Sequence, residues 1–126
     1  MFARSINFVV VVIALLPGVL YAQSKLLELT VADIHAAKHS LLGKQVRISG
    51  EVTKVFRGAS RKYYIHIQDG SGSREQGNFD VTVVSKQEAR VGEKVRVEAV
   101  VIKKRDFGFS DNYILLLDDA VLSPIK

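Results

Sequence analysis

From Lys44 to Leu122 the apolar residues of this chain recur at every second position, in five segments separated by polar or glycine-containing stretches. A period of two is the pattern of a β-strand with one buried face. The first segment is long and contains Gly50, which is typical of a bulge or a sharp bend. A long, bent first strand can pair in both halves of a small closed barrel. We expect strands at 44–55, 62–68, 79–84, 94–103 and 113–122.

One helix is expected ahead of these strands. Thr30 has the character of an N-cap residue, and Asp33, three residues later, forms a weaker version of the capping box. Apolar residues then recur at helical spacing as far as Leu42, and Gly43 is suited to close the helix. The sequence therefore predicts a single helix of about three turns before the sheet.

The first 22 residues have the pattern of a secretory signal peptide. Arg4 supplies a positive charge, residues 8–16 are an uninterrupted apolar run, and a cleavage position precedes Gln23. The run is short for a membrane-spanning helix, which needs about 20 apolar residues. We expect a cleaved signal peptide at 1–22, one mature domain at 23–126, and a periplasmic or secreted location. An uncleaved N-terminal anchor is the alternative.

The composition excludes some classes of protein and leaves others open. The chain has no cysteine, which excludes a lipoprotein anchor and any disulfide framework. It carries 18 Lys and Arg against 13 Asp and Glu, a net charge of +5. Such a mildly basic balance permits a polyanionic partner without requiring one.

Two segments resemble a known group of proteins. Residues 64–72, Tyr-Ile-His-Ile-Gln-Asp-Gly-Ser-Gly, followed by Asp-Val-Thr-Val at 80–83, are similar to a subgroup of small exported bacterial OB-fold proteins. Residues 43–52 resemble the first strand of an OB domain of the nucleic-acid-binding, anticodon-binding type. The subgroup often has Trp where this chain has Tyr64, so the stacking surface here is smaller. The resemblance spans about residues 30–122 and implies an all-β, five-stranded OB-fold barrel.

The resemblance also implies where a ligand would lie. In OB barrels the ligand crosses the second and third strands, between the first and fourth loops. Cations there can pair with phosphates, and aromatic rings can stack on bases. The ligand-binding residues expected on this basis are Tyr64, His66 and Thr82 on the strands, Arg57, Arg61 and Lys62 at the first loop, and Lys104, Arg105, Phe107 and Phe109 at the fourth.

Two kinds of binding function remain open. One is binding of single-stranded nucleic acid or another polyanion, which suits the cations and aromatic rings. The other is a periplasmic module that binds a small ligand or a protein, and export favours it because little nucleic acid is found outside the cytoplasm. The sequence does not choose between them, because one fold serves many functions.

The three histidines do not form a recognisable metal motif. His35 and His39 are spaced to share one helix face, but Lys38 lies between them and no third ligand is near in the sequence. His66 lies in the strand motif, where we expect Asp69 or the hydroxyl of Ser71 to accept its hydrogen bond. We expect no metal and no cofactor.

The carboxylates do not indicate catalysis. The segment 69–73 lacks the glycine and the distal glutamate of a calcium loop, so a turn is expected there. Asp118 and Asp119 are adjacent on a strand and should point to opposite faces unless the strand bulges. No Ser-His-Asp or Cys-His arrangement follows from the spacing, so we expect a binding module and not an enzyme.

Overall fold

The computed structural model describes residues 26–58, 60–105 and 113–125, with only the backbone of Arg105 and Tyr113. The predicted signal peptide therefore lies outside the described residues. The described chain forms six strands and two short helices. Their bounds are β1 Leu27–Glu28, α3 Val31–Ala36, α4 Lys38–Leu41, β2 Gln45–Arg57, β3 Tyr63–Gln68, β4 Asp80–Ser85, β5 Lys94–Arg105 and β6 Tyr113–Pro124.

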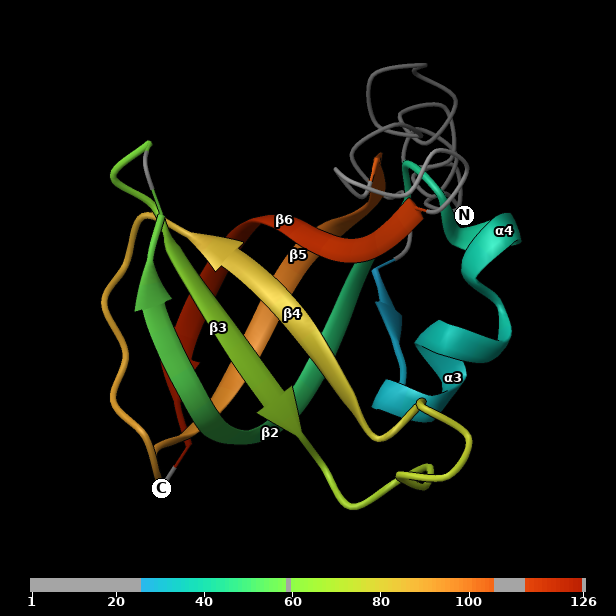
Figure 1. Cartoon of the computed structure of the whole chain (residues 1–126), viewed down its shortest axis with the longest axis horizontal. Helices are drawn as coiled ribbons and strands as arrows, with labels where there is room; N and C mark the ends of the chain where they lie inside the picture. Colours follow the sequence, from blue (N-terminus) through green and yellow to red (C-terminus); the bar gives the residue numbers. More distant parts are fainter. Residues whose placement is uncertain (1–25, 59, 106–112, 126) are drawn as a thin grey trace, which may run out of the picture.

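Five of these strands close into a barrel (Figure 1). The sheet order is β1-β2-β3-β4-β6-β5, and a further pairing joins β2 to β5. The predicted all-β, five-stranded barrel is thus confirmed. The sequence pattern does not predict β1, which adds to β2 in parallel with Leu27 opposite Val46.

The long strand β2 serves both halves of the barrel. Its residues 45–51 pair antiparallel with β5, and residues 51–57 pair antiparallel with β3. This is the double pairing that the length of the first strand predicts. Both partners are therefore held by one continuous backbone.

Gly50 lies next to the point where β2 passes from one partner to the other. A Cβ atom there would lie 2.5 Å from the carbonyl oxygen of Gln68 and 2.7 Å from Cγ2 of Ile67. Close approach of two backbones therefore explains this glycine. The register shift of β2 falls between Val52 and Lys54, so the bulge lies past Gly50 and not at it.

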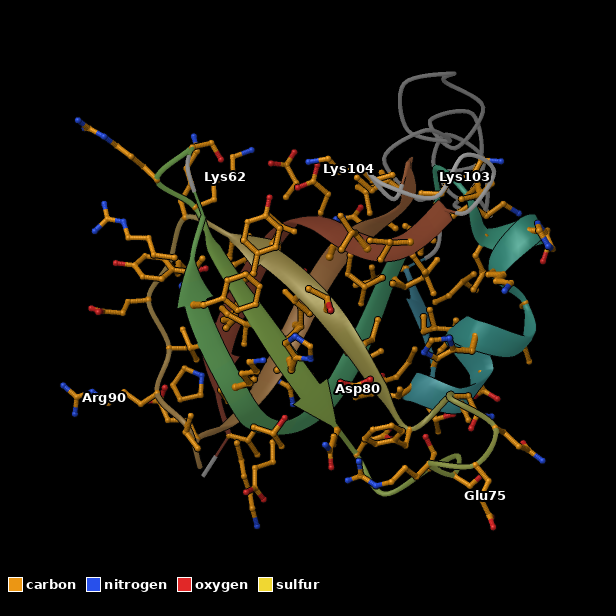
Figure 2. All side chains as sticks on the ribbon, viewed as in Figure 1. Lys62, Glu75, Asp80, Arg90, Lys103 and Lys104 are labelled. Carbon is orange, nitrogen blue, oxygen red and sulfur yellow. The ribbon has the colours of Figure 1, made fainter. Side chains whose placement is uncertain are left out.

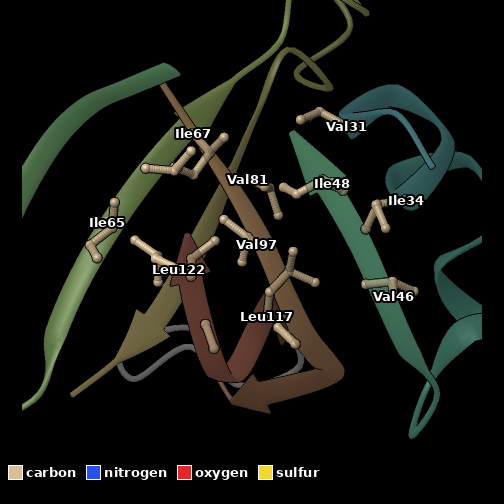
Figure 3. Close-up of a cluster of buried hydrophobic side chains, with 14 of the residues drawn as sticks. Val31, Ile34, Val46, Ile48, Ile65, Ile67, Val81, Val97, Leu117 and Leu122 are labelled. Carbon is tan, nitrogen blue, oxygen red and sulfur yellow. The ribbon is translucent and has the colours of Figure 1, made fainter. Parts of the chain in front are cut away.

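Aliphatic side chains from all five barrel strands fill the interior. Ile48, Ile65, Val83, Val97 and Leu117, one from each strand, expose 1% or less of their surface. Figure 3 shows much of this cluster, with side chains from opposite strands meeting inside the barrel. Full burial of a side chain of this kind contributes about 1.5–3 kcal/mol to stability.

Two short helices stand where the sequence predicts a single one. The break falls at Ala37, whose φ of −107° and ψ of 19° are not helical. Val31, Ile34 and Leu41 are nevertheless buried and join the barrel core, and Figure 3 shows Val31 and Ile34 beside the barrel strands. The apolar spacing identified the buried face correctly, but the prediction of one continuous helix is wrong.

The start of α3 is capped by its own N-cap residue and by the turn after β3. The Thr30 hydroxyl accepts from the backbone N–H of Asp33, and the Asp33 carboxylate accepts from the N–H of Thr30, which confirms the capping box. The Asp69 carboxylate accepts from the N–H of Val31 at 2.9 Å, and the Ser71 hydroxyl accepts from that of Ala32 at 2.9 Å. The first three N–H groups of the helix are thus all satisfied.

Replacing Asp69 with alanine should loosen this attachment. The N–H of Val31 would lose its acceptor, and loss of a cap typically costs about 1–2 kcal/mol. For a domain of this size each kcal/mol lowers Tm by about 4–8 °C. Thermal unfolding followed by circular dichroism would measure the shift. Glu75→Ala, an exposed change in the same β3–β4 connection, is the control, and equal Tm values for the two variants would contradict the capping role.

The junction between β4 and β6 holds little backbone pairing. The two strands run parallel, and their register contains Thr82 opposite Leu116 and Val83 opposite Leu117. By contrast, β3 and β4 are paired along six residue pairs from Tyr63 to Gln68. We call this short junction the β4–β6 seam.

Side chains replace the backbone ladder beyond the end of β4. The Ser85 hydroxyl donates to the carbonyl oxygen of Ala120 at 2.7 Å. The amide of Gln87 both donates to the carbonyl oxygen of Leu122, at 3.1 Å, and accepts from its N–H, at 2.8 Å. The Gln87 side chain thus mimics a strand partner for β6.

Candidate functional site: an aromatic face and a basic cleft

Two aromatic rings stack on the outer surface of β2 and β3. Phe56 and Tyr64 are directly paired across the strands. Their ring centroids lie 5.3 Å apart with an interplanar angle of 9°, within the usual range of aromatic pairs. Phe56 is 45% exposed, so the pair presents an apolar surface to solvent.

A glycine makes room for the Tyr64 ring. A Cβ atom on Gly58 would lie 2.4 Å from Cε1 of Tyr64. Any side chain at this position would therefore displace the ring from its place beside Phe56. Gly58, at the start of the β2–β3 loop, therefore leaves the space that the Tyr64 ring occupies beside Phe56.

Polar groups extend this surface along the strands. Nζ of Lys54 lies 5.9 Å from the Phe56 ring centroid, and the His66 ring lies 6.2 Å from it, tilted by 46°. His66 is paired in turn with Thr82 on β4. We call the surface formed by Lys54, Phe56, Tyr64, His66 and Thr82 the aromatic face.

His66 is fixed by a carboxylate, but not by the predicted one. Its Nδ1 lies 2.8 Å from Oδ2 of Asp80, and both side chains are 27% exposed. The expected partners, Asp69 and Ser71, hold the N-terminus of α3 instead. Asp80 stands opposite Gln68 in the β3–β4 register, two residues before Thr82. It therefore reaches His66 across neighbouring strands.

The backbone of Asp80 has a second histidine partner. Nε2 of His35, on α3, lies 2.7 Å from the Asp80 carbonyl oxygen. Because a carbonyl can only accept, Nε2 of His35 carries the proton. Asp80 thus links the aromatic face to the helical side of the molecule, and Figure 2 shows it at the start of β4 between the two.

A cleft opens on this helical side, where β4 and β6 separate before the seam. It has a volume of about 510 Å³, which falls within the range of small-molecule sites. We call it the basic cleft. Its lining residues come from both helices, the residue after α4, and three strands: His35, Lys38, His39, Leu42, Asp80, Val81, Thr82, Lys103, Ile114 and Leu115.

The predicted basic residues do not all border the aromatic face. The guanidinium of Arg57 lies 5.5 Å from the ring centroid of Tyr63 and not over Tyr64. Arg61 has a positive φ of 64° in the β2–β3 loop. In Figure 2 Lys62 lies at the upper left of the barrel, and Lys104 lies near the middle of its upper edge.

Part of the predicted fourth loop lies outside the described residues. Phe107 and Phe109 lie outside the described residues, as does the side chain of Arg105. The structure therefore brings together Tyr64, His66 and Thr82 from the predicted set. Their contacts with the fourth-loop residues remain a prediction.

Asp118 and Asp119 lie at a bulge and not on a regular strand. Asp118 is opposite Val100, but Glu98 is opposite Val121, so β6 has one residue more than β5 in this interval. Asp119 accordingly has a φ of 55°. Both carboxylates line a second cleft of about 220 Å³, which Lys62 also borders. A bulge is the exception to opposite faces that the sequence analysis allowed, and it lets both residues border one cleft.

Three members of the site were missing from the sequence-based set: Lys54, Phe56 and Asp80. Lys54 and Phe56 alternate with Val55, which is partly buried against the core, so their outward direction follows from the period of two. No local sequence pattern identifies Asp80 as the partner of His66, because that pairing depends on the β3–β4 register. Within the described residues no group of three or more His, Asp or Glu side chains is arranged to hold a metal ion.

Comparison with known proteins supports the fold. No protein-family model matches the chain, and a search of curated proteins found no match. A solved structure from Leishmania major Friedlin, provisionally assigned as an aspartyl-tRNA synthetase, is similar, with a TM-score of 0.54 and 17% identity. The match covers 82% of this chain but 22% of the synthetase chain. At this identity the likeness establishes the fold alone, and together with the closed barrel it shows that the chain has an OB-like fold.

Proposed function

We propose that this protein is a binding module that holds single-stranded nucleic acid on the aromatic face. The exposed Phe56–Tyr64 stack is the observation that carries the proposal. Proteins that bind single strands without sequence preference combine such aromatic platforms with cations that follow the phosphates. Each stacked base is worth about 1–3 kcal/mol in proteins of this kind.

The charges around the aromatic face suit an anionic strand. Nζ of Lys54 lies over the Phe56 ring, and the carboxylate of Asp80 is paired with His66. The net charge of the chain is +5. The structural likeness to a protein assigned as a tRNA synthetase supports a nucleic-acid ligand to the extent that related folds share binding surfaces.

Fluorescence anisotropy with labelled single-stranded oligonucleotides tests the proposal. We expect binding at about 50 mM salt that weakens as salt rises, with a log–log slope of about −2 to −3 if three or four phosphates are contacted. A duplex of the same sequence is the control, because its bases are not free to stack. Absence of measurable binding at low salt, or binding that does not respond to salt, would contradict the proposal.

We also propose that the protein is exported and acts by binding and not by catalysis. The pattern of residues 1–22 supports export. Among the described residues, no helix is long and apolar enough to span a membrane. Mass spectrometry of the protein from fractionated cells should find a chain that begins at Gln23 outside the cytoplasm. A full-length chain confined to the cytoplasm would overturn the export proposal.

A further inference from the structure

Two lysines and two histidines line the basic cleft, with a single carboxylate among its described lining residues. Lys38 and His39 of α4 and Lys103 of β5 line it, together with the hydroxyl of Thr82. The carboxylate on its wall, that of Asp80, is engaged by His66. Among the described residues, the surroundings of the cleft therefore favour an anion.

Part of the lining of the basic cleft is apolar. Val81 is buried, Ile114 is 44% exposed, and Leu42 and Leu115 are partly buried against the core. These four residues line the cleft together with the basic side chains, and we call them the apolar wall. An apolar wall next to a few polar groups is the usual make-up of a small-molecule site.

We propose that the basic cleft binds a small phosphate monoester with an apolar body. Several separate donors suit a phosphate, which offers three oxygens and nearly two negative charges, better than a single carboxylate. The apolar wall would cover the body of the ligand. This inference does not depend on nucleic-acid binding, because the cleft and the aromatic face share only Thr82 and are otherwise lined by different residues.

Calorimetric titration of the purified protein with three probes separates the two parts of the proposal. 1-Naphthyl phosphate carries both an apolar body and an anion. 1-Naphthol carries the apolar body alone, and inorganic phosphate carries the anion alone. We expect 1-naphthyl phosphate to bind roughly tenfold or more tightly than either of the others. If 1-naphthol binds as tightly as 1-naphthyl phosphate, the anionic part of the proposal is overturned. If inorganic phosphate binds as tightly, the apolar part is overturned, and if no probe binds, both parts are overturned.

Three variants locate the bound probe. Lys38→Ala should weaken 1-naphthyl phosphate binding roughly fivefold, and alanine should leave α4 intact because it favours helices. Lys94→Ala removes the same charge at the opposite end of β5 from Lys103 and should have no effect.

Phe56→Leu removes a ring from the aromatic face and should also leave 1-naphthyl phosphate binding unchanged. Loss of binding in Phe56→Leu with full binding in Lys38→Ala would place the probe on the aromatic face and overturn the proposal. Oligonucleotide binding measured on the same variants gives an independent result. Failure of the nucleic-acid proposal and failure of the cleft proposal are therefore distinguishable.

Discussion

Gly50→Ala is expected to cause a large loss of stability, because it places a methyl group between two paired strands of the barrel. The new Cβ would meet the Gln68 carbonyl oxygen at 2.5 Å and Ile67 Cγ2 at 2.7 Å. One of these atoms belongs to the backbone, so β2 and β3 must move apart. Overpacking of this kind costs about 3 kcal/mol, and Tm should fall by roughly 12–24 °C. Thermal and urea unfolding would measure both quantities.

Two further variants separate steric conflict from other effects at Gly50. Ser49→Ala, on the neighbouring residue, should change stability by about 0.5 kcal/mol or less. Gly43→Ala meets no atom within 4 Å, but its φ is 81°, so it should cost about 1–2 kcal/mol through backbone strain alone. A Gly50→Ala protein as stable as Ser49→Ala would show that the two backbones do not approach closely there.

Phe56→Leu should weaken oligonucleotide binding about 5- to 150-fold, because one stacking surface of about 1–3 kcal/mol is lost. Leucine keeps apolar bulk on β2 but offers no ring to a base or to Tyr64. The slope of log affinity against log salt should stay nearly constant, since no cation is removed. Anisotropy titrations at several salt concentrations would measure both.

Phe79→Leu is the matched control for Phe56→Leu. Phe79 also has an aromatic ring next to a cation, Arg74 at 4.6 Å, but it precedes β4 at the other end of the β3–β4 pair. Its replacement should leave oligonucleotide affinity unchanged. Equal losses in the two variants would mean that the strand does not lie on the aromatic face, and no loss in Phe56→Leu would remove stacking from the proposal.

The period of two was sufficient to predict the barrel. Over most of their length the barrel strands alternate between buried and more exposed residues, although β4 ends in three consecutive buried residues, Val83, Val84 and Ser85. This alternation is a property of the sequence itself. The long first strand and its double pairing followed from length alone. The break between the two helices at Ala37 could not be predicted, because the residues on both sides of it keep helical spacing and their buried positions.

The candidate site was only partly predictable. Tyr64, His66 and Thr82 lie on one surface because alternation sets their direction. The His66–Asp80 pair depends on strand register, and the bulge at Asp119 depends on β5 and β6 having unequal lengths between paired residues. Neither quantity can be read from local sequence, since both arise from contacts between distant segments.

We expect the β4–β6 seam to be a preferred place of local unfolding in the barrel. Its backbone register is short, so its amide protons should exchange with solvent without loss of the β2–β3–β4 sheet. The two clefts flank it on either side. A ligand that bridges the strands at either cleft would bind only the closed barrel, and its binding energy would add to the free energy that keeps the barrel shut.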